Sequence, residues 1–298
     1  MKIGTRGSQL ARWQAEWVRA RLAEHGVVTE IVVIKTRGDA EVDRPLHELE
    51  GKGFFTKEIE DALLDERIDV AVHSLKDLPT GLSPGLGLGA IPARHDPREA
   101  LVNGRSIAEL PSGTRVGTSS LRRIAQLRFL RPDLEVVALR GNVPTRVRKV
   151  EERDGLDAAL LALAGLERLD LGAKASPIDP LDVMPAPGQG ALGIEVRADD
   201  KTTQRALQPL HDRASAAAVT AERALLHELG GGCQTPVAAW VGSTEQGARS
   251  RLFGRVTGRD GAVQLTASAD LDPKLPEAAG EVVARLLWGE GAASLLAR

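Results

Sequence analysis

The chain has 298 residues, with 39 lysines and arginines against 41 aspartates and glutamates, a formal net charge of −2 and no tyrosine. Aromatic residues make up 3% of the sequence. General nucleic-acid binders carry a basic excess or stacking aromatics, so this balance excludes that class and leaves only local anion sites. The length exceeds what one hydrophobic core usually serves, and two or three domains are expected.

Cys233 is the only cysteine, and it follows three glycines in HELGGGCQTPVAAW. A single thiol excludes an intramolecular disulfide, a CxxC pair and a multi-thiolate zinc site. Two interpretations stay open: inert packing, because buried free cysteine is common, or a reactive thiol, because glycines offer little apolar surface. The start of the chain has no apolar signal core, and no run could span a bilayer, so a cytoplasmic protein without membrane association is expected.

Strands and helices alternate from the start of the chain. Residues 1–6 and 29–36 predict strands, the second buried on both faces because it is continuously apolar. Ser8 is placed to cap the helix between them, and Thr56 opens another helix before a strand at 68–74. This order implies a parallel sheet with right-handed crossovers.

The alternation resumes after residues 90–100, where proline and charge suggest a domain boundary. Residues 114–130 predict a strand, a hydroxyl cap and a helix, and 134–152 repeat the pattern with Asn142 as the cap. Helical propensity runs through 156–169, but a strand followed by a helix agrees better with the alternation.

The character of the chain changes near Ala214. A turn and strand at 184–197 close the middle segment, and a helix then leads from Ala214 to the triple glycine. Three antiparallel strands and a last helix follow, which predicts a small α+β domain with Cys233 at its entrance. The strands are expected within 237–242, 250–258 and 262–271, and the helix within 276–287.

Arginines gather at three expected helix starts: Arg6, the pair Arg122 and Arg123, and Arg140 with Arg146 and Arg148. A cation there opposes the helix dipole, which costs about 0.3 kcal/mol or more. Surface ion pairs would explain any single arginine. Three starts on one edge of a parallel sheet favour a compact polyanionic ligand, and on that view Arg122→Leu would leave the fold intact.

Lys76 and Asp77 directly follow a buried strand, a position from which functional side chains project in α/β sheets. They could form a structural pair, or Asp77 could accept a cationic or N–H-bearing group. His73 is expected to be a strand residue with a satisfied ring. No cluster has metal-ligand spacing, so no metal is expected.

The segments VHSLKDLPT, GTSSLRR, LRGNV, PAPGQGALGIE and GGGCQTPVA occur in this order and resemble the porphobilinogen deaminase (hydroxymethylbilane synthase) family. The resemblance covers nearly the whole chain. It implies an α/β fold with two doubly wound domains of the periplasmic-binding-protein type II architecture and a small α+β C-terminal domain. The expected domains are residues 1–93 with 187–208, residues 94–186, and residues 209–298.

The resemblance also implies the chemistry. A monomeric enzyme would join four molecules of porphobilinogen head to tail, release ammonia each time and yield linear hydroxymethylbilane. Its primer would be a covalent dipyrromethane cofactor, one per chain, held by a thioether on Cys233, which is then a tether and not a turnover nucleophile.

Site residues carry over by position as implications of the same resemblance. Asp77 matches the catalytic aspartate, and the segment before Thr56 resembles a lid with Lys52 and Phe55 as contacts. The residues that resemble cofactor-binding positions are Ser74, Lys76, Asp77, Thr118, Ser119, Arg122, Arg123 and Gln189. Those that resemble substrate-binding positions are Arg6, Ser8, Arg140, Asn142 and Arg146.

Two rival classes remain. A non-enzymatic solute-binding module of the same fold would explain the arginines but leave Cys233 idle. A cysteine hydrolase would need a histidine aimed at the thiol, and His211 and His227 are the candidates in that region.

Overall fold

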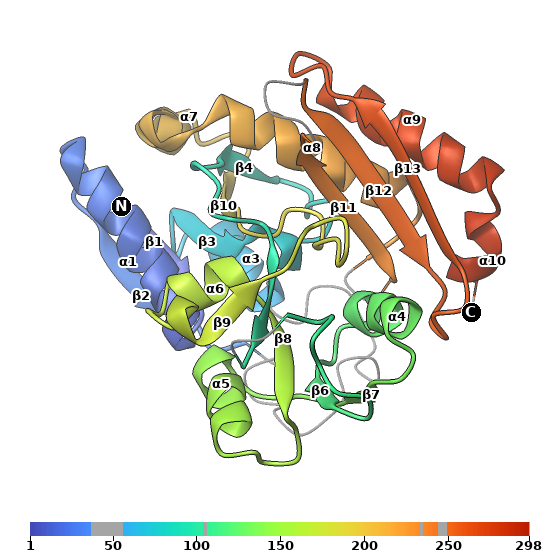
Figure 1. The fold of residues 1–298 in the computed structure, drawn as a ribbon. Helices are drawn as coiled ribbons and strands as arrows, with labels where there is room; N and C mark the ends of the chain where they lie inside the picture. Colours follow the sequence, from blue (N-terminus) through green and yellow to red (C-terminus); the bar gives the residue numbers. More distant parts are fainter. Residues whose placement is uncertain (37–55, 104–105, 233–234, 244–248, 298) are drawn as a thin grey trace. The chain divides into compact units, whose positions relative to one another are not determined.

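The computed structural model describes residues 1–36, 56–103, 106–232, 235–243 and 249–297. Contacts divide the chain into two compact units, Met1–His95 with Gly190–Ala216, and Asp96–Gln189 with Ala217–Arg298 (Figure 1). The expected three-way domain boundaries stay a prediction. No helix in the described ranges has both the length and the apolar composition needed to cross a membrane.

The first unit contains a five-stranded mixed sheet in the order β2-β1-β3-β10-β4. β1 pairs in parallel with β2 and β3, as predicted for these three strands, whereas β10 is antiparallel to β3 and β4, so the complete sheet is mixed. β10 follows a long excursion of the chain, and local alternation does not set its direction. The strands are β1 (Lys2–Thr5), β2 (Glu30–Val33), β3 (Val70–Ser74), β4 (Leu86–Ala90) and β10 (Leu192–Arg197).

β2 is an edge strand, which corrects the prediction that it is buried on both faces. Its end residues Glu30 and Val33 are exposed, and it pairs only with β1 in the described sheet. A continuous apolar run predicts burial but not the position of a strand in a sheet.

Helices cover both faces of the first sheet. α1 (Gln9–Glu24) and α7 (Lys201–Leu207) pack on one face, with η4 (Gln208–Leu210), and α3 (Lys57–Leu64) packs on the other. Ser8 caps α1 as predicted, with its hydroxyl accepting from the Ala11 N–H at 3.3 Å.

The second unit contains a sheet in the order β7-β6-β8-β5-β9. β6 is parallel to β7 and β8, and β5 is antiparallel to β8 and β9. The predicted strand and helix within 156–169 are confirmed as β8 and α6 (Leu163–Glu167). The strands are β5 (Glu99–Val102), β6 (Arg115–Gly117), β7 (Glu135–Val137), β8 (Ala158–Ala162) and β9 (Ala175–Pro177), with η3 (Gly172–Lys174) before β9.

This second sheet is also covered on both faces. α4 (Leu121–Leu130) packs on one face, and α5 (Val143–Glu151) and α6 pack on the other. In both sheets the strand next to one edge runs antiparallel, and the same spatial order recurs. Two doubly wound domains of the periplasmic-binding-protein type II kind are therefore present.

A third sheet, called sheet C below, lies in the second unit and is antiparallel. Its strands are β11 (Val237–Gly242), β12 (Arg251–Thr257) and β13 (Gln264–Asp270), and α8 (Arg213–Glu228), α9 (Pro276–Gly289) and α10 (Ala292–Leu296) accompany them. Gly280 lets α9 approach α8 closely, because a Cβ there would lie 2.7 Å from the Leu225 nitrogen. This small α+β domain is as predicted (Figure 1).

Candidate active site

Asp77 lies in a single 3₁₀ turn, η2 (Leu75–Asp77), directly after β3. The turn is fixed by Leu75, which is fully buried and whose N–H donates to the Ala191 carbonyl at 3.0 Å. Lys76 is half-buried and Asp77 is exposed. The buried leucine therefore anchors a turn that presents a carboxylate at the carboxyl end of β3.

The predicted residues around β1 lie at the same edge of the first sheet, because β1 and β3 are parallel neighbours. Arg6 directly follows β1, and Ser8 caps the next helix. Gln14 of α1 donates through Nε2 to the hydroxyl of Ser74 at 2.9 Å, which ties this helix to the end of β3. The first unit thus brings together Arg6, Ser8, Ser74, Lys76 and Asp77.

Thr118 and Ser119 connect β6 to α4 in the second unit. The Ser119 hydroxyl donates to the Leu139 carbonyl and accepts from the Leu139 N–H, both at 3.0 Å. Thr118 accepts from the Ser120 N–H at 3.3 Å. These bonds hold the ends of β6 and β7 together, so Arg140 leaves the sheet beside the start of α4.

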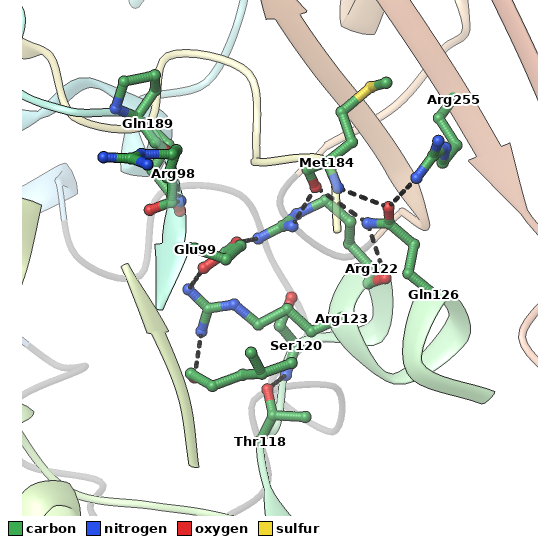
Figure 2. A network of polar contacts seen from close by, with 12 residues as sticks. Arg98, Glu99, Thr118, Ser120, Arg122, Arg123, Gln126, Met184, Gln189 and Arg255 are labelled. Atoms are coloured by element: carbon green, nitrogen blue, oxygen red, sulfur yellow. Dashed lines mark hydrogen bonds and ion pairs between the residues drawn. The ribbon is translucent and has the colours of Figure 1, made fainter. Parts of the chain in front are cut away.

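Arg122 and Arg123 share one buried carboxylate, that of Glu99 at the start of β5 (Figure 2). Arg122 Nη2 lies 2.6 Å from one carboxylate oxygen and Arg123 Nη2 lies 2.7 Å from the other. Glu99 is 0% exposed and each arginine is 6% exposed. Arg122 Nη1 also donates to the Met184 carbonyl, and Arg123 Nη1 to that of Leu160.

The negative partner of this arginine pair is therefore part of the chain. Sequence reasoning offered a surface ion pair or an external polyanion, and the structure shows a buried pair on a strand instead. Burial lowers the pKa of the Arg122 guanidinium, and the charge of Glu99 opposes that shift. Arg122→Leu would strip Glu99 of one partner, so the expectation that it leaves the fold intact is withdrawn.

Two buried donors at this edge have no hydrogen-bond partner among the described residues: Nε of Arg123 and Nη2 of Arg140. Nearby, Asn142 caps α5 by accepting from the Thr145 N–H at 3.0 Å, as predicted. Arg146 Nε donates to the Gly141 carbonyl at 2.7 Å. Unpartnered buried guanidinium nitrogens are costly, and a carboxylate ligand would satisfy them.

Sequence reasoning missed the buried charges of this unit that lie away from helix starts, among them Glu99 and Arg168. Glu99 is the first residue of β5 and follows the charged stretch RHDPR, so no signal in the sequence indicates that this acid is buried. Arg168, which follows α6, is 4% exposed, and burial lowers its pKa to about 10 while Glu167 opposes the shift. Arg168 follows a helix end, whereas the helix-dipole argument applies to arginines at helix starts.

Gln189 is fully buried, and its Nε2 donates to the Pro97 carbonyl at 2.8 Å.

Cys233, Lys52 and Phe55 lie outside the described residues. Beside the cysteine, the Thr235 hydroxyl donates to the Gly232 carbonyl at 2.7 Å. His211 accepts from the Ile91 N–H through Nδ1 at 3.3 Å. No group of three or more His, Cys, Asp or Glu in the described part of the chain could hold a metal ion.

The fold and these edges define a periplasmic-binding-protein type II-like scaffold with an acidic turn in one domain and buried cationic donors in the other. Two family models match: "Porphobilinogen deaminase, dipyromethane cofactor binding domain" over residues 1–205 and "Porphobilinogen deaminase, C-terminal domain" over residues 216–288. The chain belongs to the porphobilinogen deaminase family.

Curated relatives named porphobilinogen deaminase agree with this assignment. That of Syntrophotalea carbinolica is 49% identical over 100% of this chain and 95% of the relative. That of Moorella thermoacetica is 49% identical over 99% of this chain and 95% of the relative. That of Syntrophomonas wolfei is 46% identical over 99% and 97%.

Proposed function

We propose that the chain is a hydroxymethylbilane synthase, a transferase that condenses four porphobilinogen molecules head to tail and releases one ammonia at each step. The observation that carries the proposal is the pair of unpartnered buried donors, on Arg123 and Arg140, in a chain matched by the cofactor-binding family model. The proposed setting is cytoplasmic and the proposed state monomeric, without a metal or nucleic-acid partner.

The described residues fit a dipyrromethane cofactor. Its pyrrole rings carry acetate and propionate groups, which are acceptors of the kind that Arg123 Nε and Arg140 Nη2 lack. The bound group supplies the pyrrole carbon to which the first substrate is joined. In this proposal Cys233 holds it by a thioether, and Ser74, Lys76, Asp77, Thr118, Ser119, Arg122, Arg123 and Gln189 form its surroundings.

Arg6, Ser8, Arg140, Asn142 and Arg146 are proposed to bind the acid groups of incoming substrate. Loss of ammonia from the substrate's aminomethyl carbon leaves an azafulvenium cation. In this proposal the carboxylate of Asp77, which is exposed, accepts the ring N–H and stabilises this positive charge. A new carbon–carbon bond then forms, and the proton on the attacked pyrrole carbon is released.

A non-enzymatic binding module of the same architecture is the disfavoured alternative, because it gives neither Cys233 nor Asp77 a use. Intact-protein mass spectrometry separates the two proposals. The native chain should carry an adduct of two pyrrole units that is absent from Cys233→Ala, whereas Asp77→Asn should retain the adduct with little turnover. An unmodified native chain with full activity would refute the proposed attachment at Cys233, and a native chain that releases no ammonia from porphobilinogen would refute the proposed function.

A further inference from the structure

Buried hydrogen bonds connect the start of α4 to sheet C through the segment 181–184 (Figure 2). Gln126 of α4 binds both backbone groups of Met184: its Nε2 donates to the carbonyl at 3.0 Å, and its Oε1 accepts the N–H at 2.8 Å. The same Met184 carbonyl accepts from Arg122 Nη1 at 2.7 Å. Gln126 and Arg122 therefore share one acceptor.

Arg255 of β12 makes the connection from the other side. Its Nη1 donates to Gln126 Oε1 at 3.0 Å and to the Asp182 carbonyl at 3.1 Å, and its Nη2 donates to the Leu181 carbonyl at 2.7 Å. Nε donates to the Thr266 hydroxyl at 3.2 Å. The Arg255 guanidinium thus binds the carbonyls of Leu181 and Asp182, the side-chain amide of Gln126 in α4 and a hydroxyl of the neighbouring strand β13.

Burial of the Arg255 guanidinium has a desolvation penalty that a purely structural contact between these elements would not require. Arg255 is 6% exposed, its four hydrogen-bond acceptors are all neutral, and burial lowers its pKa to about 10 against the opposing charge of Asp182. Hydrogen bonds to neutral acceptors offset the desolvation penalty of a buried cation less than a paired carboxylate would. The guanidinium fixes the relative positions of the groups that it binds, because its donors lie in one rigid plane.

We propose that Gln126 and Arg255 are positioning residues that hold the Arg122–Arg123 pair at a fixed position relative to sheet C. This inference rests on the proposed function. Cys233 lies in the sequence between α8 and the first strand of sheet C, whereas the arginine pair begins α4. A cofactor attached at one of these places and bound through its acid groups at the other requires a fixed spacing, and a displacement of about 1 Å can cost orders of magnitude in rate.

The test follows cofactor loading, which does not require turnover by loaded enzyme. Apo-protein, made in cells that cannot produce porphobilinogen, is mixed with porphobilinogen, and the two-pyrrole adduct is followed by intact mass on the monodisperse folded fraction. The variants are Gln126→Met, Arg255→Met and Arg255→Lys. The control is Arg251→Met on the same strand, whose exposed side chain pairs with Asp270 and contacts neither Gln126 nor the segment 181–184 in any described hydrogen bond.

Loading by Gln126→Met and Arg255→Met should be about tenfold slower than in the parent, as expected for a misplaced binding group. Arg251→Met should load like the parent, and Arg255→Lys should lie between, because an ammonium cannot reproduce the planar set of donors. If the two Met variants do not fold, the loading rate of Arg255→Lys compared with that of the parent tests the inference. Folded variants that load at the parental rate would overturn the inference alone, whereas a parent that acquires no adduct would refute the proposed function.

Discussion

Glu99 holds two guanidinium groups with one carboxylate that water does not reach. Such a cluster need not stabilise the protein relative to an apolar core, but removing one member leaves buried charge without compensation. The Nε of Arg123 has no partner among the described residues and is a donor of this cluster that a ligand could use. Glu99 therefore orients the pair and leaves one nitrogen available for recognition.

Glu99→Gln should lower the free energy of unfolding by about 3 kcal/mol, because an amide keeps the shape of the side chain but leaves both arginines without a negative partner. Urea unfolding followed by circular dichroism measures the change. Asp133→Asn is the control: Asp133 forms an ion pair with Arg131 near the surface, and such pairs contribute little. Equal effects of the two substitutions would contradict the special role of Glu99.

Asp77 offers a second test at this scale. Asp77→Asn keeps an acceptor of the same shape but removes the charge, so turnover should fall by roughly 10²-fold or more while the cofactor stays attached. Asp77→Glu keeps the charge on a longer arm and should retain more activity than Asn.

Single-turnover ammonia release, cofactor content and melting temperature together decide the role of Asp77. A side chain that only stabilises the turn of Leu75–Asp77 would show a lower melting temperature with normal release per folded molecule. Near-normal release by Asp77→Asn would remove this carboxylate from the mechanism.

At the scale of elements, α5 and α7 begin with the same cap. Asn142 accepts from the N–H and hydroxyl of Thr145, and Asp200 accepts from the N–H and hydroxyl of Thr203. Loss of either cap should cost about 1 kcal/mol. Asp200 also forms an ion pair with Arg197 Nη2 at 3.0 Å, so its loss should cost somewhat more. Only the α5 cap lies next to residues proposed to bind substrate.

Asn142→Ala should raise KM several-fold because Arg146, one turn into α5, shifts with the frayed end. Asp200→Ala should lower stability at least as much, because the Arg197 pair is lost too, with KM unchanged. The pair also differs in pH dependence. Hydrogen bonds from Thr203 lower the pKa of Asp200, so its contribution is present above the unfolded value near 3.9 and is lost as pH falls through the lower folded value. The Asn142 cap does not titrate. Steady-state kinetics and melting temperatures across pH test both statements, and an equal rise in KM for the two variants would contradict the first.

The secondary-structure elements show which features of the fold can be predicted from the sequence and which cannot. Caps such as Ser8 and Asn142 and the strand–helix order within 156–169 depend on nearby residues, and they are confirmed. β4, β5 and β9 were not predicted, because they are short and contain glycine, a charge or proline. The direction of β10 and the partner of Arg122 depend on segments far apart in the chain, which local patterns do not encode.

At the scale of the whole molecule, contacts assign sheet C to the same compact unit as the β7-β6-β8-β5-β9 sheet. Side chains from several elements hold the segment that leads back to the first unit. Gln126 and Arg255 bind residues 181–184, and Glu222 of α8 accepts from the Gly188 N–H at 2.8 Å and the Val241 N–H at 2.9 Å. Glu222 is fully buried, so this part of the unit also depends on an interior charge.

These shared bonds predict that α4 and sheet C open together. Native-state hydrogen exchange in low urea, read by mass spectrometry, should give peptides from α4, β8 and β12 the same opening free energy and urea dependence, since cooperative units exchange as one. Arg255→Met should separate them, with β12 opening at lower urea because its buried contact with Gln126 is gone. Peptides from β3, which belongs to the other unit, should not change and serve as the internal reference. If β12 already opens at lower urea than α4 in the parent, the two do not form one cooperative unit, and Arg255 cannot hold them at a fixed relative position.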